Sequence, residues 1–455
     1  MSEPTLLFYD LETSGLSKTF DQVVEFAAIR TTMDLVELER HHIYVQLTKD
    51  TVPAPDAFIT HQIGLEQLAQ HGIAEAEAIT MIHRLLNQPG TISLGYNTLG
   101  FDDEFLRFKF HQHLLQPYTH QFANNCNRAD LYPMLIMYYL FSPEIINWDK
   151  ANKSMKLENI NKVNNFTTGQ SHNAIYDVIA TIQLAKKMKQ NNSMWEYLLG
   201  YFNKFNDQTR ILNLTEIHNK KVGIYIDGSL GWNKNFNCPV LYLGRHRIYK
   251  NQTIWLILNE KLPKSIEDIS KLIIRKKDGE PGFIIPFNRG EKLWSNEQIN
   301  FINDNIAWCN NNEFIGEVAD YYTQITYPKI PNCDPAADLY QAGFLSNETT
   351  AMLNQFWQTE SSKQKALLPT LPYNKKLLAE RLLWRQNPED VFSDELSNYI
   401  HAIYGNNTSL IDYRNNSFRT VQQTLNSIEA LLLEQKDNLL LEYKQWLLKI
   451  WGKLI

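Results

Sequence analysis

Two acidic side chains, Asp10 and Glu12, close a run of strand-forming residues in the stretch LLFYDLETSG near the N-terminus. Because side chains of a strand alternate between its two faces, both carboxylates project from the same side and lie close together. Like charges held so close repel, and a divalent cation such as Mg²⁺, which takes oxygen ligands, relieves the repulsion. The alternative is a strand that ends in a solvated turn built by Thr13, Ser14 and Gly15. Further acids downstream decide between the two.

Two such carboxylates follow later in the chain. Asp102 comes after an apolar run in GYNTLGFDDEFLRFKF and begins an amphipathic helix, and its neighbour Asp103 is a rival for the same role. Asp177 lies in the first turn of the helix expected in SHNAIYDVIATIQLAKKM, and His172 precedes it by five residues. Each has an ordinary explanation when taken alone, because acids favour the first turn of a helix and a histidine before a helix is commonly structural. Together with Asp10 they indicate an acidic site.

The elements that position these residues are expected within the first 195 residues. The runs TLLFYDLE, VVEFAAIRTT and HHIYVQLT predict three consecutive strands, and TISLGYN predicts a later short one. A helix is expected in AEAEAITMIHRLLNQ, and others begin at Asp102, Ala129, Lys156 and Asn173. This order predicts a mixed sheet covered by helices, in an α/β (α+β) protein of several domains.

A different pattern follows the first domain. KVGIYIDG, CPVLYLGRHRIYK, QTIWLILNE and PGFIIPF are short β segments separated by Gly, Pro and Asn, which is typical of a small barrel-like β domain. Beyond YPKIPNCDPAADLY the chain is helical, with leucine and aromatic stripes that we expect to form core. The predicted domains are 1–195, 196–345 and 346–455.

Composition sets outer limits on the function. The 455 residues suffice for two to four domains, and a hydrophobic content of 44% is enough for ordinary cores. No apolar run is long enough to span a bilayer, and the four cysteines show no zinc-binding spacing. We expect a soluble, cytoplasmic monomer with no membrane partner and no zinc site. The net charge of −6 argues against a protein that coats nucleic acid with its whole surface.

One segment departs from this acidic balance. From Arg245 to Arg289, ten Lys and Arg residues stand against five acids, and this surplus makes the segment a candidate for contact with phosphates. A solvated face of the β domain explains the charge equally well. Tyr249 or Trp255 are candidate platforms for base stacking. The candidate phosphate track is Arg245, Arg247, Lys250, Arg275, Lys276 and Lys277.

The acidic motifs, taken in order, resemble a known family. D-x-E-T-S-G on a first strand, F-D-x-x-F-L after a later strand and H-x-A-x-x-D on a last helix occur within 180 residues. This pattern resembles the DEDDh family of 3′ to 5′ exonucleases, whose fold is a ribonuclease-H-like mixed sheet. The resemblance implies that four acids hold two Mg²⁺ ions, which Mn²⁺ can replace, and that a histidine is the general base. By matching the motifs, these residues are Asp10, Glu12, Asp102, Asp177 and His172.

Two-metal chemistry explains why such a site needs these residue types. One ion lowers the pKa of the attacking water and the other stabilises the leaving 3′ oxygen, whereas a histidine can accept a proton near pH 7. Asp102 fits the second motif better than Asp103 does, because only Asp102 places Phe105 and Leu106 at the required spacing. The first motif also implies contacts to the terminal nucleotide from Thr13, Ser14 and Gly15.

The resemblance extends beyond the nuclease motifs. Compact members of the family end near residue 190, whereas this chain continues as the bacterial exonuclease I group does, with an SH3-like β domain and a C-terminal helical domain. FYDLETSG, GYNTLGFDDEF, HNAIYDVIATIQLAK and ADLYQAGFLS are similar to that group too. Tyr96 stands where the wider family has a histidine, and one additional residue separates Asn97 from Asp102. This departure favours the same group.

The implied activity is 3′ to 5′ degradation of single-stranded DNA to 5′-mononucleotides in DNA repair and recombination. The motifs do not distinguish sugars, so a 3′ to 5′ RNA exonuclease is an alternative. A scaffold that binds without cutting is another, although such scaffolds usually lose a metal ligand. The resemblance also implies a partner, the acidic, phenylalanine-ended tail of single-stranded-DNA-binding protein. That tail requires an apolar pocket with Lys or Arg beside it, to be sought first in the basic β domain and its junction with the helical domain.

Overall fold

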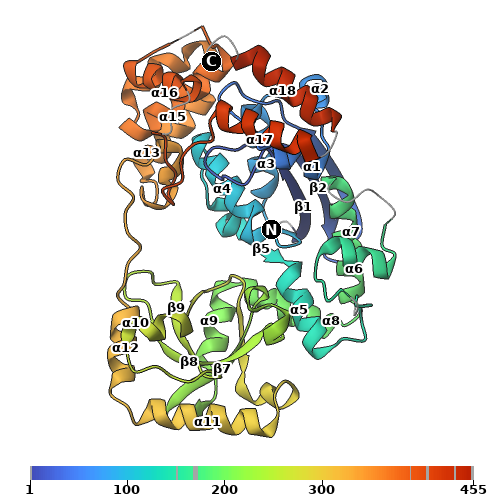
Figure 1. Cartoon of the computed structure of the whole chain (residues 1–455), viewed down its shortest axis with the longest axis vertical. Helices are drawn as coiled ribbons and strands as arrows, with labels where there is room; N and C mark the ends of the chain where they lie inside the picture. The colour runs from blue at the N-terminus through green and yellow to red at the C-terminus, as the bar shows by residue number, and fades with distance from the viewer. Residues whose placement is uncertain are drawn as a thin grey trace.

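The computed structural model describes residues 3–149, 152–167, 173–389, 391–405, 409–434 and 437–451. Its three parts are a helix-covered mixed sheet, an antiparallel β domain and a C-terminal helical region (Figure 1). The predicted fold class is therefore confirmed.

The first sheet carries the acidic motifs. Its strand order is β3-β2-β1-β4-β5, with β1 antiparallel to β2 and parallel to β4. Alternate residues of β1 bury into two separate cores, because helices cover both faces of the sheet. The strands are β1 (Thr5–Thr13), β2 (Val23–Thr32), β3 (Glu37–Tyr44), β4 (Thr91–Gly95) and β5 (Asn127–Asp130).

Helices on the two faces come from the predicted segments. On one face α7 (Ala174–Met188) packs against β1 and β2, and on the other lie α3 (Glu75–Leu86) and α4 (Asp102–Gln112). Leu6 and Phe8 of β1 point toward α7 and share its core. Since Asp10 and Glu12 continue the same alternating row, their carboxylates emerge on the α7 side.

Two expectations about local structure are corrected. No helix begins at Ala129, which lies in β5, and α5 (Leu131–Phe141) starts after it. Asp130 ends the strand in an extended conformation and caps α5 by accepting the N–H of Tyr132. A four-residue strand is too short to show an alternation in the sequence. The third strand, expected over HHIYVQLT, begins earlier, at Glu37, and ends at Tyr44.

The β domain is a separate antiparallel sheet with the order β10-β9-β8-β7-β11. Its strands include β10, which was not predicted as a strand and contains the basic run Arg275, Lys276 and Lys277. A short strand, β6 (Glu216–Ile217), also pairs with β7. The five main strands are β7 (Lys220–Ile226), β8 (Asn237–Arg245), β9 (Gln252–Ile257), β10 (Ile273–Lys277) and β11 (Phe283–Pro286).

The C-terminal helical region packs against the nuclease sheet's own helices. Its last two helices, α17 (Val421–Glu434) and α18 (Asn438–Trp451), contact α1 (Pro55–His61), as Figure 1 shows in red beside blue. The expectation that the final leucine and aromatic stripe forms core is confirmed. Its buried members include Leu425, Ile428, Leu440, Tyr443 and Leu447.

The predicted domain boundaries stay predictions. The limit at residue 345 falls just before α13 (Asn347–Gln358), whereas the limit at 195 falls inside α8 (Asn192–Leu199). Trp195 and Leu198 of α8 belong to the core shared with the nuclease sheet, which also includes β-domain residues such as Ile224. Of the helices that the structure describes, none combines the length and the apolar character needed to cross a membrane.

A buried ion network joins the helical region to the nuclease sheet. Arg385 of α15 (Tyr373–Gln386) pairs with Asp50 at 2.9 Å and with Glu75 at 3.1 Å, and both carboxylates are almost fully buried. The hydroxyl of Tyr399 donates a further hydrogen bond to Asp50. Burial opposes the charge on Asp50, but the Arg385 guanidinium outweighs it and holds the pKa of that carboxyl below its usual range.

Removing this guanidinium is expected to loosen the helical region. Arg385→Met leaves the buried Asp50 without a cationic partner and leaves Glu75 with His113 at 3.4 Å, which costs about 3–5 kcal/mol of unfolding free energy. Urea unfolding followed by tryptophan fluorescence measures the loss. Lys363→Met is the control, since Lys363 pairs with Glu360 on the surface and should leave the unfolding midpoint unchanged. Equal midpoints for the two variants would show that the network does not hold the interface.

Candidate active site

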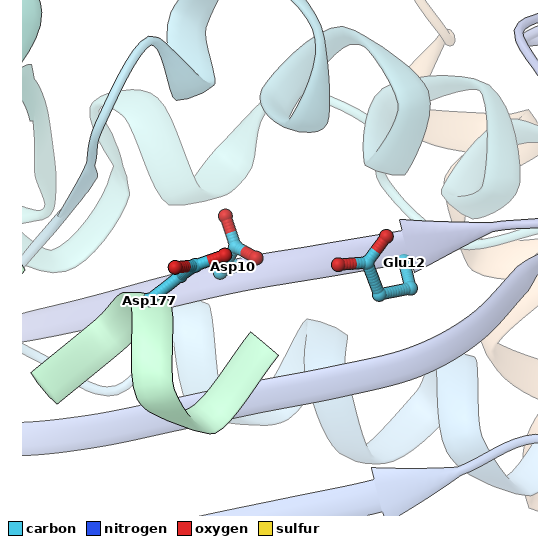
Figure 2. Close-up of side chains that lie close together, drawn as sticks. All are labelled: Asp10, Glu12 and Asp177. Atoms are coloured by element: carbon cyan, nitrogen blue, oxygen red, sulfur yellow. The ribbon is translucent and has the colours of Figure 1, made fainter. Parts of the chain in front are cut away.

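The structure brings three of the predicted acids together. Oxygen atoms of Asp10, Glu12 and Asp177 all lie within 4.8 Å of one another. Figure 2 shows Asp10 and Glu12 projecting from β1, with Asp177 of α7 beside them. The strand places its two carboxylates on one face, and the first turn of α7 sets the third against them. Each of the three is partly exposed, so the cluster is open to a ligand.

The fourth predicted acid, Asp102, is buried next to this cluster. It is the first residue of α4, which begins shortly after the end of β4. A hydrogen bond from the backbone N–H of Leu11, between Asp10 and Glu12, reaches its carboxylate. Its charge also raises the pKa of Asp10. The structure therefore places four carboxylates around the end of β1.

Asp103, the rival for the fourth position, is committed elsewhere. Its buried carboxylate lies 2.6 Å from Arg128, 2.9 Å from His120 and 3.2 Å from Arg107. Despite burial, these partners, Arg128 foremost, hold its pKa far below the usual range. A carboxylate so neutralised has little remaining affinity for a metal ion. This geometry favours Asp102, as the motif spacing predicts.

Burial and mutual repulsion disfavour the charged forms of the clustered acids. Burial, then the charges of Glu25, Asp177 and Asp102, raises the pKa of Glu12 to about 9. Burial is also the main cause that raises the pKa of Asp102 to about 8 and that of Asp10 well above its usual value. Oxygen ligands that repel one another fit a hard divalent cation, which removes the repulsion when it binds.

The burial of these acids and their mutual repulsion predict that the stability of the protein depends on divalent metal ions. The folded-state pKa values near 8 and 9 exceed the unfolded values of about 4, so the folded protein binds more protons between these limits. In a chelator, these groups therefore reduce stability progressively as the pH rises from about 5 to about 9. Mg²⁺ competes with those protons. Its stabilising effect is expected to be small at pH 5.5 and several degrees in Tm at pH 8.5.

Thermal unfolding with and without Mg²⁺ across this pH range measures the effect. The difference between the two curves isolates the metal site, because histidines elsewhere in the fold titrate in both. A Tm that is unaffected by Mg²⁺, Mn²⁺ and Ca²⁺ at every pH would mean that the four acids do not form a cation site.

His172 lies outside the described residues, so its predicted role as a base stays a prediction. The residues that follow it in the motif are informative. Asn173 precedes the first turn of α7, and Asp177 lies within that turn and in the acidic cluster. The chain that carries His172 thus leads directly into the helix that supplies an acid.

Glu25 is a site residue that the sequence analysis missed. It lies opposite Glu12 in the β1–β2 ladder and is fully buried. Its carboxylate lies 2.5 Å from His42 Nε2 and accepts the N–H of Ala174 at 3.3 Å. Glu25 therefore links β2 to the start of α7. Glu25 follows an apolar pair in the second strand, and only its cross-strand pairing with Glu12 would have identified it.

The residues after Glu12 form a tight turn. The Ser14 hydroxyl is buried and donates to Asp21, and a Cβ at Gly15 would lie 2.5 Å from the same carboxylate. Thr13 is mostly buried as well and donates to the Gly15 carbonyl. Thr13 and Gly15 line a cavity of about 580 Å³ beside Glu12, whereas the Ser14 side chain holds the turn. The predicted contacts of Thr13, Ser14 and Gly15 with a nucleotide stay predictions.

Two of the predicted DNA contacts are wrong, one for Lys276 in the phosphate track and one for Trp255 as a stacking platform. Lys276 has its ammonium buried against Asp207 at 2.6 Å, so it is not available to a phosphate. Trp255 is fully buried in the β-domain core and is not a stacking platform. For Lys276 the alternation of β10 turns the side chain inward, since Arg275 and Lys277 on either side of it are more exposed. Trp255 lies in β9, whose six residues are all buried.

The other track residues differ in availability. Arg245 pairs with the buried Asp278 at 2.6 Å, and Arg247 pairs with Asp320 on the surface. Lys250 is exposed, and Lys277 is half-exposed near Glu280. The Arg275 guanidinium lies over the Tyr327 ring, which contacts the candidate platform Tyr249. Their contact with DNA stays a prediction.

The chain is similar to known exonucleases. Residues 7–185 match the family model described as Exonuclease. The chain is 30% identical over 282 residues to exodeoxyribonuclease I of Haemophilus influenzae and 32% identical over 239 residues to that of Escherichia coli. These alignments cover 60% and 51% of this chain. They span only 59% and 50% of the two relatives' own lengths.

Solved structures match over the whole chain. The zinc-bound complex of E. coli exonuclease I with single-stranded DNA has a TM-score of 0.85 at 23% identity, covering 100% of both chains. The enzyme from Methylocaldum szegediense has a TM-score of 0.83 at 22% identity, covering 99% of this chain and 100% of that one. At such identities the likeness is one of fold.

The mixed sheet with acids from β1, α4 and α7 is thus the exonuclease domain of a larger, three-part protein. The β domain and the C-terminal helical region, which follow this domain in the chain, also share the fold of the solved enzymes. Over the aligned residues the chain is similar in sequence to bacterial exodeoxyribonuclease I, and its whole fold is that of the solved exonuclease I structures.

Proposed function

We propose that this protein degrades single-stranded DNA from its 3′ end and releases 5′-mononucleotides. The proposal rests on one observation. Four carboxylates lie around the end of β1, inside the segment that matches the exonuclease family model. The similarity to exodeoxyribonuclease I sequences supports DNA as the substrate.

The chain's own residues have distinct tasks in this reaction. Asp10, Glu12, Asp102 and Asp177 would hold two divalent ions, proposed to be Mg²⁺. When bound, such a pair supplies an activated water and stabilises the charge on the leaving oxygen. Buried Asp102 and the Glu25 link to α7 keep the carboxylates at fixed separations. His172, by its place in the motif, is proposed to accept the proton of the attacking water.

The rival activity is 3′ hydrolysis of RNA, since nothing in the acidic cluster discriminates a 2′-hydroxyl. Matched end-labelled DNA and RNA oligomers of one sequence, incubated with the purified protein and Mg²⁺, separate the two. The DNA is expected to shorten faster. Faster loss of the RNA would overturn the choice of substrate. A non-catalytic scaffold is disfavoured, because all four acids are present and three of them lie within 4.8 Å of one another.

We also propose a partner site for the tail of single-stranded-DNA-binding protein. A solved structure of exonuclease I includes that protein in its name. A cavity of about 390 Å³ between α5, α8 and β11 offers an apolar floor that includes Met137, Phe141 and Met194. Arg289 and Lys292, both exposed, also line it. This arrangement suits an aromatic ring with a carboxylate. It lies where the nuclease sheet meets the β domain, not at the expected junction with the helical domain.

Titration of a fluorescent tail peptide tests this site. The peptide with its terminal phenylalanine is expected to bind, and the peptide without it to bind at least tenfold more weakly. Arg289→Glu should abolish binding. Charge reversal of Arg275 and Lys277, which lie on β10, is the matched control and should leave peptide affinity unchanged. Equal affinity of both peptides, or an effect only in the control, would exclude this cavity.

A further inference from the structure

We propose that Asp130 is a positioning residue of the metal site, because it holds the stretch of backbone that delivers Asp102. Asp130 is the last residue of β5, and it pairs with Gly95 at the end of the parallel neighbour β4. From Gly95 the chain runs through residues 96–101 into α4, whose first residue is Asp102. Asp130 therefore lies beside the connection that carries a proposed metal ligand. The inference rests on the proposed function, since it concerns how the site of that reaction is held in place.

The Asp130 carboxylate binds this connection through two hydrogen bonds. One oxygen accepts the backbone N–H of Asn97 at 2.8 Å, and the other accepts that of Leu99 at 3.1 Å. The first oxygen also accepts the N–H of Tyr132 at 2.9 Å, which is the cap of α5. Asp130 is only 1% exposed, so the carboxylate is shielded from water and engaged by backbone donors on both oxygens.

The backbone of the connection explains why it needs such a support. Asn97 has φ 62° and ψ 23°, in the left-handed region that residues other than glycine seldom adopt. A Cβ at Gly95 would lie 2.5 Å from the Tyr9 carbonyl, so the connection begins in close contact with β1. A tight turn leaves backbone N–H groups without a helix or sheet partner, and buried N–H groups need an acceptor. Asp130 supplies two acceptors, which fixes the start of α4 against the end of β1.

The charge of Asp130 acts on Asp102 as well. Burial is the main cause that raises the pKa of Asp102 to about 8, and the negative charge of Asp130 adds to this rise. Burial also raises the pKa of Asp130 itself to about 7, whereas its three backbone N–H donors oppose the rise. The bonds to the connection therefore favour the charged carboxylate. A negative charge so close to Asp102 adds to the attraction of the acidic site for a divalent cation.

A role as a helix cap alone does not explain the contacts of Asp130. The side chain of Asn203, which caps α9 (Lys204–Leu212), accepts an N–H of its own helix. Asp130 makes the equivalent bond to α5, but its two other bonds reach residues 31 and 33 positions earlier in the chain. Those two bonds join β5 to the connection before α4, so they serve the position of Asp102 rather than the start of α5.

Glu25 shows the same arrangement at the other helix that supplies an acid. It is a fully buried carboxylate on β2, and it accepts the N–H of Ala174 at the start of α7. The chain entering α4 and the chain entering α7 are thus each held by a buried carboxylate from a strand of the sheet. This repetition supports positioning as the task of Asp130.

Equilibrium binding of Mn²⁺ to Asp130→Asn, measured by electron paramagnetic resonance, tests the inference without any substrate. The amide keeps the size of the side chain and one oxygen that can cap α5, but its NH₂ group cannot accept the N–H of Leu99. Mn²⁺ affinity is expected to fall about tenfold or more, as is typical when a residue that orients a metal ligand is changed. In hydrolysis of a single-stranded DNA oligomer, kcat should fall by about 10–100-fold. The KM for DNA should stay at the wild-type value, because the change leaves strand binding intact.

Two further variants separate positioning from folding. Asp130→Ser can still cap α5, but its shorter side chain loses both bonds to residues 96–101, so it should show the same loss of Mn²⁺ affinity. Asn203→Ala removes the cap of α9 and is the control that should keep wild-type Mn²⁺ affinity and kcat. Thermal unfolding of each variant reports whether it folds.

The inference is overturned if folded Asp130→Asn or Asp130→Ser binds Mn²⁺ as tightly as wild type does. A loss of thermal stability with unchanged Mn²⁺ affinity would equally contradict it, since a residue that only caps α5 would give that result. The proposed function fails separately, if wild type binds Mn²⁺ but does not cut single-stranded DNA. The Mn²⁺ affinities of the variants decide the role of Asp130 in that case too.

Discussion

Asp10→Asn is expected to lower the rate of single-stranded DNA hydrolysis by about 10³-fold or more while leaving DNA binding intact. Asp10 lies within 4.8 Å of two other acids and is repelled by Asp102 as well, so it is the carboxylate best placed to contact both ions. Loss of a metal-held transition-state interaction worth about 4 kcal/mol corresponds to this factor. The amide keeps the size of the side chain, so the fold should be unaffected.

Initial rates on a labelled oligomer and anisotropy with the same oligomer measure the two properties. Asp34→Asn is a suitable control, since Asp34 is an exposed acid in the turn after β2, where it pairs with Lys189. That variant should keep wild-type rates. If Asp10→Asn retained more than about a tenth of the wild-type rate, the catalytic centre would have to lie elsewhere in the chain.

The adjacent acids Asp102 and Asp103 are expected to give opposite results when each is changed to Asn. Asp102→Asn should remove catalysis about as fully as Asp10→Asn does, yet leave stability unchanged or raised in metal-free buffer. The reason is that burial already disfavours its charge, with a pKa of about 8. Asp103→Asn should cost about 3–5 kcal/mol of unfolding free energy, because Arg128 and Arg107 lose their buried partner.

Urea unfolding and initial rates of the two variants, measured side by side, test this contrast. Asp103→Asn is expected to keep substantial activity per folded molecule, since its carboxylate does not face the metal site. If Asp103→Asn were stable but inactive and Asp102→Asn unstable but active, the motif alignment would be off by one residue.

The acidic site was largely predictable from sequence because strand alternation and the order of short motifs suffice to identify its residues. Strand alternation alone places Asp10 and Glu12 together, and motif order adds Asp102 and Asp177. What the sequence could not show is the set of partners that arrive across the sheet. Glu25 meets Glu12 only through the β1–β2 register. His120 and Arg128 reach Asp103 only in the folded chain. Arg107 is its i+4 neighbour on α4, so only this part of the neutralisation had a local signature.

The basic segment shows the opposite case, in which a linear count of charge was misleading. Lys276 lies between Arg275 and Lys277 in sequence, but strand β10 turns it toward the buried Asp207. The strand itself was missed because its polar residues mask the alternation.

We propose that the four acids support 3′ to 5′ hydrolysis of single-stranded DNA. A time course tests this proposal, with the same DNA oligomer labelled either at its 3′ end or at its 5′ end and with Mg²⁺ as the only added metal. The 3′ label is expected to appear at once as a mononucleotide, while the 5′ label passes through a ladder of shortening strands, and a chelator is expected to stop both. Immediate release of the 5′ label, internal cuts, or unchanged rates in the chelator would contradict it.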